Sequence, residues 1–229
     1  MGSRLQARGF TLIELVMVIL LLGVMVTFSS QFIGIGTQIY GDASSREQLM
    51  SDARFAMERL NRELRDAVPG SVRVEDAGGG LVERGTCLRF WPIATASRYL
   101  GSAVSNGLSI VTPSVLPKKD EDLAIVYPLA STGFLNQGCL QGSCTARVTG
   151  SDVSGALPLT LSNSFAKDSP GRRVYFASRQ VRYCVQGAVL TRASAAIGTD
   201  ITASPAALMA EHIRPAAYYF YREPAAFSP

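Results

Sequence analysis

The stretch RGFTLIELVMVILLLGVMVTF, residues 8 to 28, decides how the rest of the chain is read, because it is long and apolar yet contains Glu14. The apolar character lasts from residue 10 to about residue 32, roughly 20 or more residues, which is the length of helix that spans a hydrocarbon core. Arg4 and Arg8 precede it, and basic residues before an apolar segment stay on the cytoplasmic side. The segment therefore predicts one membrane-spanning helix, with the N-terminus in the cytoplasm and the remaining chain on the opposite side.

Glu14 requires a partner, because an ionised carboxylate deep in a bilayer costs on the order of 3 kcal/mol. If the chain is cut between Gly9 and Phe10, the new α-amine lies one helical turn from Glu14, at i and i+4, and the positive end of the helix also favours the carboxylate. In a helical assembly the amine of a neighbouring subunit could serve equally well. The alternative is an ordinary secretory signal cleaved near Ser29 or Ser30, but this alternative lacks a small-x-small cleavage site and leaves Glu14 without a role.

The residues Gly9, Phe10, Thr11, Leu12, Ile13 and Glu14, between a short basic leader and an apolar stretch, resemble the N-terminus of the type IV pilin and pseudopilin superfamily. The resemblance implies that a prepilin peptidase cuts after Gly9 and N-methylates Phe10, and that Glu14 sets axial register against a neighbour's amine. It further implies an inner-membrane subunit with a periplasmic head, which assembles with other major and minor pilin subunits and uses no cofactor.

Residues 45–68 carry apolar side chains at steps of three and four, which is typical of one face of an amphipathic helix that covers a sheet. The opposite face is charged, and pairs such as Arg59 with Glu63 stand at i and i+4. Pro69-Gly70 is expected to end this helix. Because each glycine costs about 1 kcal/mol relative to alanine, we expect a bend, local melting or a flexible joint at residues 34–41.

Beyond residue 70 the pattern changes to short alternating runs, which predict an α+β fold with the long helix packed on a mainly antiparallel sheet. The expected strands are 86–93, 123–129, 173–178, 180–185 and 188–192, with a tight hairpin at Gln186-Gly187. Stretches 94–120 and 130–171 are expected to be rich in loops. The predicted organisation is a leader at 1–9, a membrane and filament-core helix at 10–33, an amphipathic helix at 34–68 and a β-rich head at 69–229.

Four cysteines, Cys87, Cys139, Cys144 and Cys184, lie beyond the apolar segment without any C-x-x-C pair. An even number of separated cysteines after an export signal predicts disulfides rather than a metal site. Of the three possible connectivities we favour Cys139 with Cys144, which closes a short loop, and Cys87 with Cys184, which join two strand-like runs.

The sequence shows no catalytic constellation. His212 is the only histidine and is expected to be structural, since no G-x-S-x-G motif accompanies it. The net charge of +4 is small and scattered, which argues against a nucleic-acid partner. Trp91 and the aromatic run at 218–221 are expected to be mostly buried, with a sugar- or partner-binding surface as the alternative.

Within the superfamily, the head resembles the MshO group, the minor pilin-like proteins of mannose-sensitive haemagglutinin (MSHA) pilus biogenesis. This resemblance rests on the order of FWPIATASRY (90–99), SPGRRVYFAS (169–178), VRYCVQGAVLTR (181–192) and MAEHI (209–213). Such heads generally finish with further strand, whereas this chain stops at Pro229. The leading hypothesis is thus a non-enzymatic minor pilin that initiates or caps a fibre. A minor pseudopilin of a type II secretion system, and a soluble exported binding domain or enzyme released by ordinary signal cleavage, are the alternatives.

Overall fold

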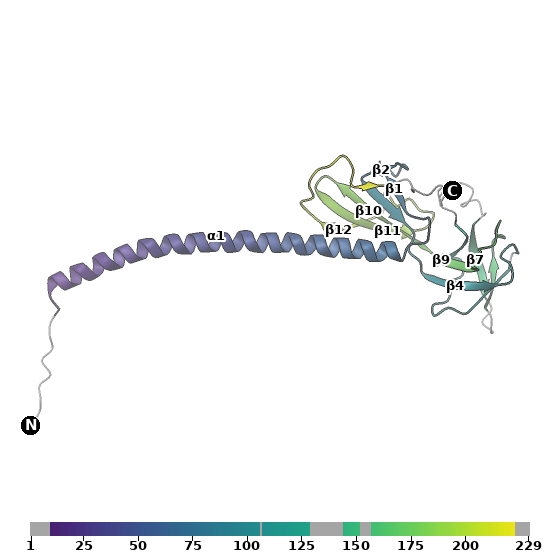
Figure 1. The fold of residues 1–229 in the computed structure, drawn as a ribbon, viewed down its shortest axis with the longest axis horizontal. Coiled ribbons are helices and arrows are strands. Elements are labelled where there is room, and N and C mark those ends of the chain that lie inside the picture. Colours follow the sequence, from purple (N-terminus) through teal and green to yellow (C-terminus); the bar gives the residue numbers. More distant parts are fainter. Residues whose placement is uncertain (1–9, 106, 129–143, 152–156, 223–229) are drawn as a thin grey trace, which may run out of the picture. The chain divides into compact units, whose positions relative to one another are not determined.

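The computed structural model describes residues 10–105, 107–128, 144–151 and 157–222. It begins with one helix, α1, from Leu12 to Arg65 (Figure 1). The helix ends three residues before the predicted end, where Asp66 and Ala67 donate backbone hydrogen bonds to the carbonyls of Arg62 and Leu64. The chain then leaves the helix ahead of Pro69, which cannot donate a helical hydrogen bond.

The glycine-containing segment at 34–41 remains helical. The expected local melting is therefore wrong in this structure. Around it the helix also satisfies side-chain donors, because the hydroxyl groups of Thr37 and Ser45 donate to the carbonyls of Gly34 and Gly41, each at 2.9 Å. A glycine costs only about 1 kcal/mol in a helix, too little to break a helix that continues on both sides.

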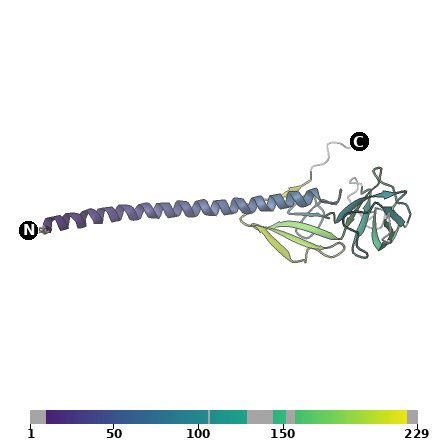
Figure 2. The ribbon, with the colours of Figure 1, turned by 90° about the horizontal axis from the view of Figure 1, so that it is seen from below.

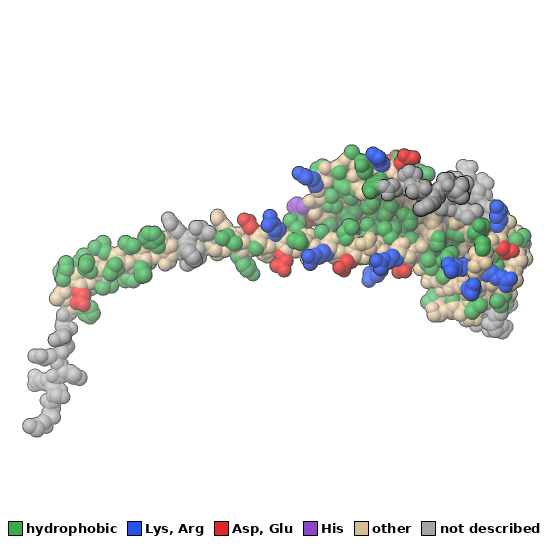
Figure 3. Space-filling model, in the orientation of Figure 1, with side chains coloured by type: hydrophobic (Ala, Val, Ile, Leu, Met, Phe, Trp, Pro, Cys, Tyr) green, Lys and Arg blue, Asp and Glu red, His purple; other side chains and the backbone are tan. Residues whose placement is uncertain are grey.

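The chain divides into two compact units, residues 1–51 and residues 52–229. The first unit contains the apolar part of α1, where the window Leu12–Ser29 has a mean hydropathy of 2.6 and no buried residue. Hydrophobic side chains cover this part of the helix (Figure 3). By length and composition it is the one helix of the described chain that is able to cross a membrane.

The second unit contains an antiparallel sheet of five strands in the order β1-β3-β10-β11-β12. These strands are β1 (Arg73–Glu75), β3 (Cys87–Phe90), β10 (Arg179–Gln186), β11 (Val189–Ala196) and β12 (Ala206–Ala210). The last turns of α1 lie beside this sheet (Figure 2), and Ala56 and Leu60 are buried in one apolar cluster with Phe90 and Tyr183. Ala53 and Met57, which belong to the same predicted stripe, are exposed, so the sheet covers only part of the stripe.

A closed barrel of six strands forms the other part of this unit, in the order β4-β5-β8-β7-β6-β9. Its strands are β4 (Thr95–Leu100), β5 (Gly107–Ile110), β6 (Leu123–Val126), β7 (Thr145–Ser151), β8 (Leu157–Leu161) and β9 (Arg173–Ala177). The barrel has its own apolar core, which includes Leu108, Val148 and Phe176. Strands β4, β5, β7 and β8 lie in the stretches 94–120 and 130–171, which were expected to be rich in loops, and none of these four strands was predicted.

The barrel is an insertion between two neighbouring strands of the sheet. Strands β3 and β10 pair directly, yet the six barrel strands lie between them in the sequence. The chain enters the barrel beside the end of α1, where the Val68 amide donates to the Trp91 carbonyl at 2.8 Å and the Ile93 amide donates to the Asp66 carbonyl at 2.7 Å. These bonds hold the start of the insertion against the end of the helix.

All five predicted strands are confirmed, as β3, β6, β9, β10 and β11. The hairpin between β10 and β11 is also confirmed, but its two turn residues are Gly187 and Ala188, one position later than predicted. Gly187 has a φ of 62°, a backbone conformation that glycine adopts without strain. A further small sheet pairs β2 (Arg84–Gly85) with β13 (Phe220–Tyr221).

Candidate functional site: the N-terminal segment and its attachment to the head

The first turn of α1 contains the residues that the sequence singled out. Thr11 stands just before the helix, and its carbonyl accepts hydrogen bonds from the amides of Glu14 at 3.1 Å and Leu15 at 3.2 Å. A threonine followed three residues later by glutamate is the pattern of a helix N-terminal capping box. Gly9 lies outside the described residues, and Phe10 is 80% exposed and precedes the helix.

Glu14 is a carboxylate on an otherwise apolar surface. Its neighbours Ile13 and Leu15 are 68% and 59% exposed, so apolar side chains flank it on the helix surface. Across the described chain, neither a hydrogen bond nor an ion pair forms with the Glu14 side chain. The partial positive charge of the helix N-terminus contributes about 0.3–1 kcal/mol at an exposed site, which is less than the cost of a charge in a bilayer. No basic side chain among the described residues compensates this charge.

The apolar part of α1 has no polar face. Every residue from Phe10 to Ser29 is exposed, and the least exposed large hydrophobic side chain of this stretch, Val16, still has 37% of its surface exposed. A helix that is hydrophobic all round is suited to a bilayer or to the interior of a larger assembly, rather than to a water-facing surface. The Thr27 hydroxyl donates to the Val24 carbonyl at 2.8 Å, so this polar group is also satisfied within the helix.

Residues 4–30 match the family described as the prokaryotic N-terminal methylation motif. The chain therefore has the N-terminus of a type IV pilin-like or pseudopilin protein. The motif indicates a membrane-anchored structural subunit that is processed by a prepilin peptidase and assembles with other pilins. No curated protein and no solved structure matches the chain, so the resemblance of the head to the MshO group has no support from these comparisons.

Glu63 links the end of α1 to the five-stranded sheet. Its carboxylate accepts hydrogen bonds from Arg59 Nε at 3.1 Å, from Arg192 Nε at 3.1 and 3.0 Å, and from the Tyr183 hydroxyl at 3.0 Å. Burial alone would raise the pKa of Glu63, but the hydrogen bonds from Arg192, Arg59 and Tyr183 outweigh burial and hold this pKa below its ordinary value. Burial and the negative charge of Glu63 raise the pKa of Tyr183 to about 12. The predicted Arg59–Glu63 pair is thus confirmed as part of a larger cluster.

A row of three arginines crosses the sheet on neighbouring strands. Arg73 lies opposite Arg89, and Arg89 lies opposite Arg182, in the registers of β1 with β3 and of β3 with β10. The fully buried carboxylate of Glu75 contacts all three: its Oε1 contacts Arg73 Nε and lies 2.8 Å from Arg89 Nε, and its Oε2 lies 3.1 Å from Arg182 Nε. Like charges in adjacent strands repel, so Glu75 is the group that permits this row.

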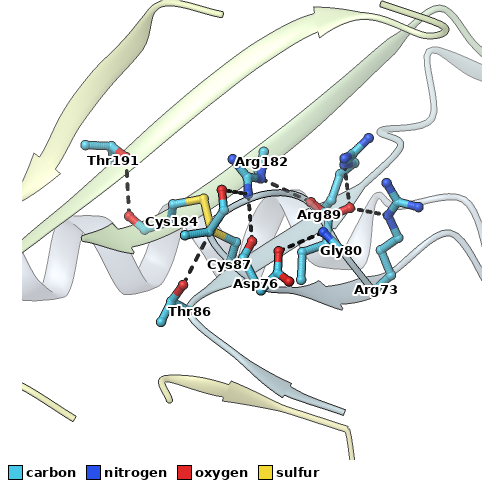
Figure 4. Close-up of a disulfide and its surroundings, with 11 residues drawn as sticks. Arg73, Asp76, Gly80, Thr86, Cys87, Arg89, Arg182, Cys184 and Thr191 are labelled. Carbon is cyan, nitrogen blue, oxygen red and sulfur yellow. Dashed lines mark hydrogen bonds and ion pairs between the residues drawn. A yellow bond between two sulfur atoms is a disulfide. The ribbon is translucent and has the colours of Figure 1, made fainter. Parts of the chain in front are cut away.

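Arg182 also holds the loop that follows β1. Its Nη2 donates to the carbonyls of Asp76 and Ala77, each at 2.9 Å (Figure 4). Within that loop the Gly80 amide donates to Asp76 Oδ1 at 2.7 Å, and a Cβ at Gly80 would lie 2.6 Å from Asp76 Oδ2. The network therefore fixes a tight glycine loop against the sheet, which is a structural role.

Cys87 and Cys184 form a disulfide beside this network (Figure 4), which is the pairing that the sequence favoured. They lie directly opposite each other in the β3 and β10 register, with Cα atoms 4.1 Å apart. The neighbouring Val185 amide donates to the Thr86 carbonyl, so the cysteines occupy a non-hydrogen-bonded pair, where opposite side chains are closest. Cys144 is also disulfide-bonded, and its expected partner Cys139 lies outside the described residues.

The remaining aromatic candidates divide into two groups. Trp91 is 2% exposed, and Tyr219 and Phe220 pack against the core of the sheet. Tyr218 and Tyr221 are 39% and 61% exposed, so the expectation of burial is wrong for these two. His212 is exposed and has a φ of 60°, in the left-handed region of backbone conformation.

The sequence reasoning missed the Glu63 cluster with the sheet and the arginine row. The row had a signal, because each arginine stands between two apolar residues of a strand, as in VRV, LRF and VRY. In an alternating strand such an arginine points to the face opposite the apolar core. Three arginines on the same face of neighbouring strands repel one another, so the pattern predicts a carboxylate that contacts all three.

Proposed function

We propose that this chain is a minor pilin-like subunit of type IV pilus biogenesis, of the MSHA type, which primes or caps a fibre. A prepilin peptidase removes residues 1–9 and N-methylates Phe10. Residues 10–33 then anchor the subunit in the inner membrane, with the N-terminus cytoplasmic and the head periplasmic, until the helix moves from lipid into the filament core. The observation that carries this proposal is the methylation motif at residues 4–30, together with a glutamate in the apolar part of α1.

In this mechanism Glu14 selects the axial position of the subunit. The methylated amine of Phe10, on the same chain or a neighbouring one, neutralises the carboxylate when the two helices are in register. A subunit out of register leaves a charge in an apolar interior, at a cost of several kcal/mol. The absence of any side-chain partner for Glu14 among the described residues supports a partner supplied by cleavage or by assembly.

The head supports a specialised position in the fibre. A plain shaft subunit needs a helix and a sheet, whereas this chain inserts a six-stranded barrel between β3 and β10. Such an insertion favours a subunit at a priming or tip position, where fewer neighbours surround the head. A minor pseudopilin of a type II secretion system shares the N-terminal features and is the second candidate.

Mass spectrometry of the mature protein from its native host tests the processing step. The expected mature chain starts at methylated Phe10, and a start near residue 30 would establish ordinary signal cleavage instead. Replacing Gly9 by a bulky residue should block processing, and unchanged processing would contradict the peptidase assignment.

Incorporation into sheared fibres tests the role of Glu14. Glu14→Leu should leave membrane insertion intact and reduce incorporation at least tenfold, because the helix loses its register contact. Glu47→Leu is the matched control, since Glu47 is an exposed glutamate farther along α1, and it should incorporate normally. Normal incorporation of Glu14→Leu would contradict the register role.

Deletion of the gene separates the two candidate systems. Loss of MSHA-type fibres would support the pilus subunit, and loss of protein secretion would support the pseudopilin of a type II secretion system.

A further inference from the structure

The outer face of the barrel carries a cleft of about 410 Å³ between β4, β9 and the segment that follows β5. Its walls include Ala96, Arg98, Pro113, Arg173 and Tyr175. The volume lies within the range of ordinary ligand-binding clefts, and most of the lining is apolar. Nothing in the proposed function uses this cleft.

Pairing between β4 and β5 ends beside the cleft. In β4 and β5, Tyr99 lies opposite Ile110 and Leu100 lies opposite Ser109, and the Val111 amide continues the ladder by donating to the Arg98 carbonyl at 2.9 Å. The same register would place Ala96 opposite Pro113. Proline has no amide hydrogen and cannot continue the ladder, so strand pairing with β5 ends at this point.

The edge of β4 therefore faces the cleft. The Tyr99 amide donates to the Arg172 carbonyl at 2.9 Å, so alternate residues of β4 direct their backbone groups toward β9. The backbone groups of Ala96 and Arg98 point to the other side of β4, away from β9. The Arg98 carbonyl accepts its hydrogen bond from the Val111 amide on that side. The backbone amide and carbonyl of Ala96 thus point into the opening between β4 and Pro113.

Two arginines on this face lack an acidic partner. Arg98 lies directly opposite Arg173 in the register of β4 with β9. Both lie against Gly171: Arg98 donates to its carbonyl from Nε at 3.4 Å and from Nη2 at 3.3 Å, and Arg173 Nε lies 3.5 Å from the position of a Cβ on that glycine. In the described chain neither guanidinium forms an ion pair with a carboxylate. Opposed like charges destabilise a sheet, and an anion between them removes that cost.

We propose that this cleft binds an extended segment of a protein partner that carries an aspartate or glutamate side chain. The segment adds to the edge of β4 through the backbone of Ala96, and its carboxylate lies between Arg98 and Arg173. Apolar side chains two residues from the acid lie on the same face of the segment and pack on Tyr175 and Pro113. The arrangement combines main-chain hydrogen bonds with a charged pocket for one side chain, which is how peptides are recognised by strand addition.

The proposal is tested by fluorescence polarisation with the full chain in detergent and three labelled peptides. The first peptide is Val-Thr-Glu-Thr-Val, the second has glutamine in place of glutamate, and the third has proline in place of both threonines. We expect the glutamate peptide to bind at least tenfold more tightly than the other two, with weaker binding at higher salt. Equal binding of the glutamate and glutamine peptides would overturn the charged pocket, and equal binding of the proline peptide would overturn strand addition.

Three variants locate the site. Arg98→Gln and Arg173→Gln should each weaken the glutamate peptide at least tenfold, and Ala96→Phe, which fills the cleft but keeps both arginines, should do the same. Arg179→Gln is the matched control, because Arg179 is an exposed strand arginine of the five-stranded sheet, and it should bind as the parent does. An equal loss with Arg179→Gln would show non-specific attraction and overturn the site. Displacement of the peptide by glucuronate with the same arginine dependence would assign the cleft to a small acid instead and overturn the proposal.

Discussion

Removing the Cys87–Cys184 disulfide should strongly destabilise the head. The two cysteines are 97 residues apart in the sequence, and the whole barrel lies between them. In the chain-entropy relation, a cross-link that closes a loop of this length lowers the entropy of the unfolded chain enough to contribute about 4.7 kcal/mol at 25 °C. The Cys87→Ala/Cys184→Ala double variant should therefore lose about 4–5 kcal/mol of unfolding free energy. The variant removes both thiols, so no free cysteine is left to form other disulfides.

The assay is urea unfolding of the full chain in detergent, followed by fluorescence of Trp91, the single tryptophan of the chain. Trp91 is buried where β3 leads into the barrel, so its emission reports the connection that the disulfide closes. The Cys139→Ala/Cys144→Ala variant is the comparison, because its expected loop is short and the same relation gives about 2 kcal/mol. A loss below about 1 kcal/mol for the first variant, or a larger loss for the second, would refute the loop-closure reasoning.

Three further changes test the head by the same unfolding assay. Glu63→Gln should cost about 1.5–3 kcal/mol at pH 7, since charged hydrogen bonds hold this carboxylate. The pKa of Glu63 is lowered on folding, so the stability that its carboxylate contributes is present above the pKa of the unfolded chain and is lost as the pH falls through the pKa of the folded chain. If the difference in unfolding free energy between Glu63→Gln and the parent persists at low pH, this pH dependence is contradicted. Gly85→Ala should cost about 1–3 kcal/mol of unfolding free energy, because its Cβ would lie 2.2 Å from a backbone oxygen. Gly107→Ala is the control and should change this free energy by no more than about 0.5 kcal/mol, because the nearest atom to its Cβ would be 4.0 Å away. Equal losses in the two variants would exclude a clash at Gly85. Phe176→Ala should cost about 3–5 kcal/mol, as the side chain is fully buried in the barrel core, and a cost under about 1 kcal/mol would mean that the barrel does not unfold with the sheet.

The elements that sequence predicted correctly are those whose pattern is complete within a few residues. Strand β10 contains the run QVRYCV and follows a segment of similar character, and its hairpin to β11 contains a glycine. The first turn of α1 is likewise specified locally, because Thr11, Glu14 and the apolar run stand together in the sequence. Local propensity and tertiary structure agree at these positions, so little further information was needed.

The barrel was missed because its strands depend on their partners. Strands β5 and β8 read GLSI and LPLTL, short runs that contain glycine, serine, threonine or proline and have weak strand propensity of their own. They pair with each other across a long sequence separation, and closure into a barrel supplies the partners that an isolated strand would lack. Strand propensity measures how a residue fits a pleated, half-buried surface, and that surface cannot be read before the pairing is known.

Glu75 and Glu14 differ in whether the described chain itself supplies cations that neutralise the carboxylate. Glu75 is completely buried, and three arginines from adjacent strands surround it, so folding of the head alone satisfies its charge. Glu14 lies on an apolar helix and has no such partner among the described residues, although the cost of leaving a charge in an apolar medium is similar in kind. Glu75 is therefore a requirement of the fold, and its replacement should be detected as a loss of stability. In the proposed function Glu14 is required for assembly rather than for folding, so its replacement should be detected only when the helix enters an assembly.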